Sequence, residues 1–121
     1  MNSETNNLIH KQIILDLTIR TLERDSKYIK KLKLHYAIEE WISAKIKELQ
    51  NDLKTVKSQL YKFGVKIQSE NRLDESFTEY IVLERGLKFE LKYSNIALRN
   101  WVNEEAKRLL GLPYRKSEYS K

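Results

Sequence analysis

Few residues in this chain have the types and spacing that metal binding or nucleophilic catalysis requires. The sequence contains two histidines and no cysteine, which excludes a thiol nucleophile, a disulfide framework and a cysteine-based zinc site. His10 stands alone, whereas His35 and Glu39 are four residues apart and would share one face of a helix. Because a metal site needs three or four ligands and no second histidine pair exists, we expect neither a metal ion nor a cofactor.

Carboxylates are the remaining candidates for acid–base chemistry. Adjacent residues on a helix point about 100° apart, so neither doublet, Glu39-Glu40 or Glu104-Glu105, converges on one substrate atom. Glu79 falls on the apolar face of a predicted β-hairpin, where burial would raise the pKa of its carboxyl. No nucleophile or second acid accompanies it, so the sequence predicts no enzyme.

The glycines leave no loop that could cradle a phosphate. There are three of them, and each has a structural position: Gly64 and Gly111 follow helical patterns, and Gly86 lies between two strand patterns. Neither G-x-G-x-x-G nor the Walker pattern occurs. We therefore expect no nucleotide chemistry of these types, and no small-molecule ligand.

Basic residues form the second candidate site. The chain carries a net charge of +6, from 23 Lys and Arg against 17 Asp and Glu, and residues 27–72 hold most of the excess. On an unbroken helix, spacings of four, three and four would align four cations in one stripe able to follow a phosphate backbone. These are Arg20, Arg24, Lys27 and Lys31. Because Glu23 and Asp25 interrupt the stripe and a solvated helix face explains the same residues, nucleic-acid binding is our second hypothesis.

The elements that must position these residues follow from a change of hydrophobic period at Gly64. After it, residues 87–93 alternate strictly between apolar and polar, which is typical of a half-buried β-strand. Before it, apolar residues recur at spacings of four and three, which indicates one stripe of a long helix. The residues of this stripe are Ile42, Ile46, Leu49, Leu53, Val56, Leu60 and Phe63.

Helices are predicted on both sides of the strand region. The first begins near Ser3 or Thr5, and its break lies either near residue 25 or nearer 34, because Ile29, Leu32 and Tyr36 continue a helical period. The second runs from the mid-thirties to Phe63, where Gly64 ends it. A last helix is capped by Ser94 or Asn95 and stops at Gly111 and Pro113.

Between these helices we predict a three-stranded meander with strands at 65–67, 77–83 and 87–93. A three-residue loop, Glu84 to Gly86, would place Leu83 opposite Leu87 and Ile81 opposite Phe89. In the same register, Glu79 opposes Leu91 and Phe77 opposes Tyr93. Ile81 and Phe89 would then be buried neighbours, with Lys88 and Lys92 exposed. A competing interpretation makes 74–110 one long helix, but it leaves Gly86 in the helix interior.

The fold class is therefore α+β: an N-terminal helical arm of one or two helices plus a long helix, a three-stranded antiparallel meander, and a C-terminal helix. Residues 1–112 form a single domain and 113–121 a mobile basic tail. The start of the chain has no signal-peptide pattern and no segment long enough to span a membrane, so we expect a cytoplasmic protein without a membrane partner.

The long helix supplies the function hypothesis. At 1.5 Å per residue it would extend roughly 42 Å, against roughly 23 Å for a seven-residue strand. The sheet and last helix would leave part of its stripe uncovered, so the first helix or a second copy of the chain must cover the rest. We expect a non-catalytic protein–protein interaction module, a self-associating adaptor or regulator. The expected interface residues are Ile42, Ile46, Leu49, Leu53, Val56 and Leu60.

Overall fold

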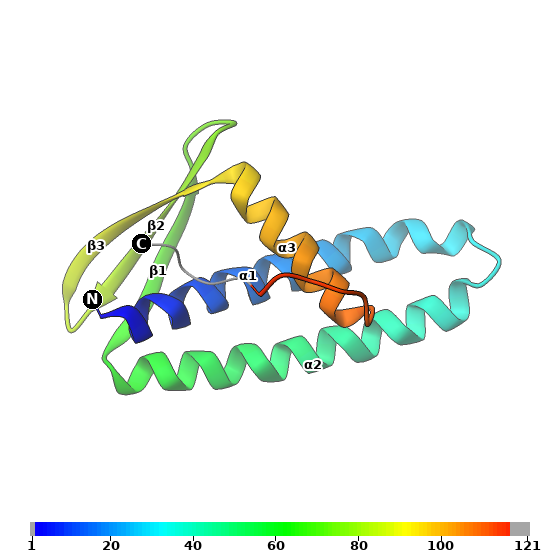
Figure 1. Cartoon of the computed structure of the whole chain (residues 1–121), viewed down its shortest axis with the longest axis horizontal. Helices are drawn as coiled ribbons and strands as arrows, with labels where there is room; N and C mark the ends of the chain where they lie inside the picture. Colours follow the sequence, from blue (N-terminus) through cyan, green and yellow to red (C-terminus); the bar gives the residue numbers. More distant parts are fainter. Residues whose placement is uncertain (1, 117–121) are drawn as a thin grey trace.

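The computed structural model describes residues 2–116, and it has the predicted α+β architecture. Figure 1 shows two long helices lying side by side, a sheet at one end of them, and a third helix crossing them. The elements are α1 (Ser3–Asp25), the 3₁₀ helix η1 (Ser26–Lys31), α2 (His35–Lys62), β1 (Val65–Arg72), β2 (Phe77–Glu84), β3 (Leu87–Ser94) and α3 (Asn95–Leu109). The single-helix alternative for 74–110 is thus wrong, because β2, β3 and the Gly86 turn occupy that region.

The helical arm is an antiparallel hairpin of α1 and α2. Asn2 caps α1, and its side-chain oxygen accepts a hydrogen bond from the Thr5 N–H at 2.8 Å. The chain leaves α-helical geometry at Asp25, continues as η1, and turns at residues 32–34 before α2 begins at His35. Both candidate break points are therefore real: the helix type changes at the first, and the chain reverses at the second.

The sheet is an antiparallel meander in the order β1-β2-β3. β1 is longer than predicted: it extends from Val65 to Arg72 through residues that are polar and were expected to form a loop. Its register against β2 shifts between Ile67 and Ser69, which marks a β-bulge at Gln68. The bulge changes which residues face the helices, so that Glu70 joins the side on which Ile67 lies.

The predicted register between β2 and β3 is wrong by one residue. The loop has two residues, Arg85 and Gly86, and Glu84 pairs with Leu87. Both loop residues have positive φ, 51° and 84°, as a type I′ turn requires. The Arg85 N–H donates to the Gly64 carbonyl at 2.8 Å, which ties this tight turn to the end of α2.

The one-residue shift reverses the faces of β2. Tyr80 and Val82 point into the core, while Ile81 lies opposite Glu90 on the other face, so Ile81 and Phe89 are not neighbours across one face. Glu79 moves with Ile81: it pairs with Asn71 and Lys92, away from the helices. The reason for expecting an unusual carboxyl at position 79 is therefore removed. Lys88 and Lys92 are exposed, as predicted.

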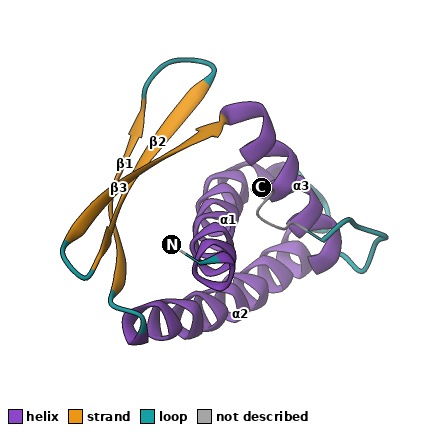
Figure 2. Ribbon diagram, turned by 60° about the vertical axis from the view of Figure 1, so that its left-hand side comes forward, coloured by secondary structure: helices purple, strands orange, loops and turns teal. Residues whose placement is uncertain are grey.

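The core lies between one face of the sheet and the three helices, as Figure 2 shows from the side. Ser94 is the N-cap of α3 and accepts a hydrogen bond from the Ala97 N–H at 3.3 Å. The buried residues at its centre come from every layer: Ile9, Ile13, Leu15, Leu49, Val56, Leu60, Tyr80, Val82, Tyr93, Leu98 and Leu109. This core is shared by α1, α2, α3 and the sheet.

The C-terminal segment after α3 is described as far as residue 116. The Arg115 N–H donates to the Glu104 carboxylate at 2.7 Å, which holds this extended segment against α3. Residues 117–121 of the predicted tail lie outside the described residues. Within residues 2–116, no helix combines the length and apolar character that crossing a membrane requires.

Candidate functional site

The predicted interface stripe lies inside the chain rather than on its surface. Four of its six residues are buried, and the other two are partly buried against the core: Ile42, Leu49, Val56 and Leu60, then Ile46 and Leu53. The reason is the length of the covering segment, since α1 and η1 together span residues 3–31 alongside the 28 residues of α2. One chain thus covers this stripe without a second copy.

The four predicted phosphate-contacting cations do not form one stripe. Arg20 lies on α1 and holds Glu70 of β1 at 2.9 Å and Asp16 at 3.3 Å, so its guanidinium joins the arm to the sheet. Partial burial opposes its charge, but the hydrogen bond to Glu70 and the two carboxylates outweigh this and raise the pKa of Arg20. Arg24 is exposed in the last turn of α1, the helix that ends before η1 begins.

Lys27 and Lys31 belong to η1, where each residue advances by about 120° instead of 100°. A spacing of four therefore separates them by about 120° around the axis. Both are exposed, together with Lys30 and Lys33. In 3₁₀ geometry residues three apart share a side, so Lys27 and Lys30 lie on one side of η1 and Lys31 on another, and the predicted stripe is lost.

The end of the arm, residues 26–36, is the main exposed apolar feature and is called the tip from here on. Four of its large side chains are half to three-quarters exposed: Tyr28 at 68%, Leu32 at 50%, Leu34 at 72% and Tyr36 at 78%. The His35 and Tyr36 rings contact each other, with centroids 4.0 Å apart. The tip stands at the far end of the long axis from the sheet (Figure 1). Its apolar side chains therefore face solvent and do not pack into the core.

The residues that usually stabilise a helix N-terminus are also missing at the tip. Leu34 occupies the N-cap position of α2 and makes no side-chain cap bond, although Ser, Thr, Asp or Asn is preferred there. The first turn of α2 contains no acidic residue to complement the helix dipole. Since α1 and α3 both have side-chain caps, the missing cap distinguishes α2 from the other two α-helices.

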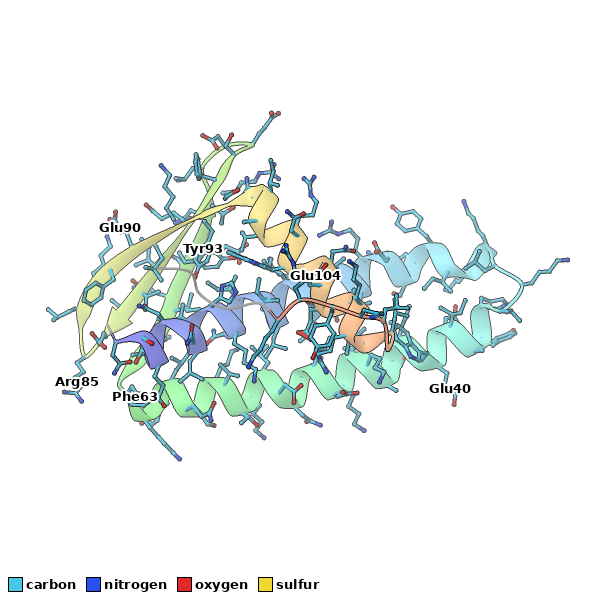
Figure 3. The ribbon with its side chains drawn as sticks, in the orientation of Figure 1. Glu40, Phe63, Arg85, Glu90, Tyr93 and Glu104 are labelled. Atoms are coloured by element: carbon cyan, nitrogen blue, oxygen red, sulfur yellow. The ribbon has the colours of Figure 1, made fainter. Side chains whose placement is uncertain are left out.

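A second feature is the aromatic cluster around His10 at the other end of the arm. His10 is buried. Its ring centroid lies 4.4 Å from that of Trp101 in an edge-to-face arrangement, and 6.1 Å from that of Tyr93 in a stacked one. Figure 3 shows Tyr93 on β3, the strand that leads into α3. Burial lowers the pKa of His10 to about 4, so the imidazole is neutral at pH 7. Burial also raises the pKa of Tyr80 in the same core.

An open groove of about 820 Å³ lies beside this cluster, between α1, α3 and the C-terminal segment. Two of the four carboxylates that line it are paired. Glu104 accepts from Arg115 and holds Lys107 at 2.9 Å, and Glu105 pairs with Arg108. The bond from the Arg115 N–H and the nearby lysine lower the pKa of the Glu104 carboxyl. The described residues contain no cluster of three metal-ligating side chains.

The sequence patterns did not identify the tip as an exposed surface. Leu32 and Tyr36 continue a helical period with Ile29, and that period indicates a helix without showing which of its residues are exposed. The available signal was compositional: residues 26–36 contain four lysines and no acid, with apolar and aromatic residues between them. A helix that packs against a core has apolar residues on one face and charged residues on the other, rather than the two mixed along one segment.

These features define a small α+β domain whose helical hairpin projects beyond a one-sided sheet. The chain belongs to the family described as YhjD protein, whose model matches residues 1–114. That match covers every described helix and strand. We found no match to this chain among curated proteins or among solved structures.

Proposed function

We propose that this chain is a non-catalytic protein-interaction domain, an adaptor that binds an acidic partner protein through the tip. The observation that carries the proposal is the group of four exposed apolar side chains set among four exposed lysines. Soluble monomers seldom expose contiguous apolar surface without a binding role. Tyrosine in particular is enriched among the residues that contribute most to protein interfaces.

The chemistry of the partner follows from the charge of the tip. Lys27, Lys30, Lys31 and Lys33 are interspersed with the apolar residues along the tip, and no acidic residue lies within it. An acidic surface would complement this potential and accelerate encounter. A second copy docked tip to tip would instead oppose lysine with lysine. The tip therefore favours a partner of different sequence over self-association at this surface.

The missing cap at Leu34 supports the same conclusion. Replacing a good N-cap by an apolar residue costs about 1 kcal/mol of helix stability. Departures from local stability rules are expected at functional sites, where another requirement decides the residue. An exposed leucine at this position contributes nothing to the core, so its apolar surface is available for a partner.

Nucleic-acid binding is the second candidate, since Tyr28 and Tyr36 could stack on bases beside lysine-bound phosphates. Two observations favour a protein instead. Leu32 and Leu34 offer apolar area that a phosphate backbone does not use, and Arg20 is engaged by Asp16 and Glu70. The test must therefore separate the two partner classes directly.

The proposed experiment is affinity capture from the lysate of the native cell, with and without nuclease. The tip variant is Leu34→Ser with Tyr36→Ser, and a charge variant is Lys30→Glu with Lys33→Glu. Tyr61→Ser is the matched control, because Tyr61 is 83% exposed but lies at the opposite end of α2. We expect proteins that survive nuclease to bind the wild type and the control, and to be lost from both variants.

Two outcomes would overturn the proposal. If the tip variant retains the same bound proteins as the wild type, the tip is not the binding surface. If nuclease removes all specific binding, and binding to duplex DNA or RNA falls steeply with salt, the nucleic-acid alternative is correct.

A further inference from the structure

The two edges of the sheet differ in how well they are protected. β1 forms one edge and carries the bulge at Gln68, a device that interrupts regular pairing with another strand. β3 forms the other edge, and its eight residues pair with β2 in unbroken register. An edge that is regular, exposed and eight residues long is suited to pairing with a further strand.

The tight turn determines which backbone groups β3 presents at this edge. Because Glu84 and Leu87 close a two-residue hairpin, the N–H and C=O groups of Leu87, Phe89 and Leu91 point toward β2. Those of Lys88 and Glu90 point away from β2. Among the described residues, no backbone hydrogen bond outside the sheet ladder engages these two residues.

We propose that β3 pairs antiparallel with β3 of a second copy of this chain, about a two-fold axis at Phe89. This inference goes beyond the proposed function and uses a different surface. The axis would oppose Lys88 with Glu90 of the second copy, and Glu90 with its Lys88. It would also set Leu87, which is 65% exposed, against Leu91 of the second copy. Cross-strand pairs of opposite charge and of apolar side chains both stabilise a sheet.

Charge disfavours one neighbouring register, and the start of α3 disfavours the other. An axis at Glu90 would oppose Glu90 with itself and Lys88 with Lys92, which places like charges together. An axis at Leu91 would bring Ser94, where α3 begins, against Lys88 of the second copy. The Phe89 axis keeps the pairing clear of α3. Figure 3 shows the Glu90 side chain directed away from the helices, as the pairing requires.

The two copies would form one six-stranded sheet, since residues that oppose each other in antiparallel strands point to the same face. Leu87, Phe89 and Leu91 of both copies would line the helix-covered face. Lys88 and Glu90 of both copies would lie on the open face. The tips take no part in the contact, so the partner-binding and pairing surfaces can be tested separately.

Sedimentation equilibrium of the full chain, from micromolar to millimolar concentration, tests the proposal with a charge-complementation design. Lys88→Glu alone would oppose two carboxylates, and Glu90→Lys alone would oppose two lysines. We expect each single variant to weaken dimerisation about tenfold or more. Mixed together, the two variants should form a 1:1 heterodimer, because their charges are then complementary.

Three controls make each outcome decisive. Circular dichroism confirms that each variant folds, and Glu79→Lys makes the same charge change on the central strand, where dimerisation should persist. The double variant Lys88→Glu with Glu90→Lys should dimerise like the wild type. A wild type that stays monomeric at millimolar concentration would overturn the proposal, as would single variants that dimerise normally or fail to complement each other.

Discussion

The sheet end and the tip lie at opposite ends of the same helical arm but obey different rules. At the sheet end, α1 and α2 bury aliphatic residues against the sheet and α3, with Leu49 and Ile9 fully inaccessible. At the tip, η1, the turn that follows it and the start of α2 expose tyrosine and leucine between lysines. The buried apolar contacts are therefore concentrated at one end of the arm, and the exposed apolar and charged side chains lie at the other.

Helix capping shows the same contrast. The cap of α1 at Asn2 lies at the sheet end, and the cap of α3 at Ser94 joins that helix directly to β3. The N-cap of α2 at the tip is Leu34. Each good cap contributes about 1 kcal/mol of helix stability. This stabilisation is present at the two helix N-termini near the core and absent at the tip.

The largest effect should come from placing a charge at each end. Leu49→Asp buries an unpaired carboxylate at a fully buried position and should unfold the domain. Leu34→Asp makes the same change at the exposed N-cap, where aspartate is preferred, and should keep or slightly raise the free energy of unfolding. Urea denaturation followed by circular dichroism measures both. A folded, stable Leu49→Asp protein would contradict the assignment of the stripe to the core.

A smaller effect is expected at the junction between arm and sheet. Gly64 has φ +71°, and a Cβ there would lie 2.9 Å from the Arg85 Cγ, so Gly64→Ala combines backbone strain with crowding of the hairpin turn. Gly111 has φ +75° with no atom near its Cβ position, so Gly111→Ala reports the strain alone. Left-handed geometry costs roughly 1–2 kcal/mol for a non-glycine residue. Thermal unfolding should therefore show a greater loss for Gly64→Ala, and equal losses would refute the contact with Arg85.

A third expected effect is a pH dependence of stability that His10 contributes at the sheet end and that appears only below pH 6.5. His10 has its pKa lowered from 6.5 to about 4, so the unfolded chain binds this proton more readily than the folded one. Its contribution to stability is thus complete above pH 6.5 and is lost as pH falls toward 4. His10→Phe keeps an aromatic ring without the titration, so the stability difference between wild type and variant should change across this range. An NMR titration midpoint near 6.5 for His10 would contradict the burial.

The helices and the meander could be predicted because their signals are long and repeated. The stripe from Ile42 to Phe63 keeps one period over several turns, and residues 87–93 alternate without exception. β1 was underestimated because residues after Ile67 are polar, and their pairing is imposed by β2 rather than by their own propensity. Pattern reasoning detects a strand with an apolar face more readily than a polar edge strand.

The hairpin register and the tip could not be predicted, for different reasons. The register depends on Arg85 adopting φ 51°, a conformation that its hydrogen bond to the Gly64 carbonyl stabilises. The sequence instead suggested a three-residue loop that ends at Gly86. The tip depends on the change to 3₁₀ geometry at Ser26, which interrupts the helical period that Ile29, Leu32 and Tyr36 suggested. Both outcomes come from local backbone conformation that residue periodicity does not encode.

The claim that the apolar residues of the tip serve binding rather than folding is tested most directly by removing them together. The variant combines Tyr28→Ser, Leu32→Ser, Leu34→Ser and Tyr36→Ser, and the measurement is its free energy of unfolding in urea. We predict a value within about 2 kcal/mol of the wild type, since exposed substitutions each change stability by about 0.5 kcal/mol or less. A loss of about 4 kcal/mol or more would be comparable to a core truncation and would contradict the claim.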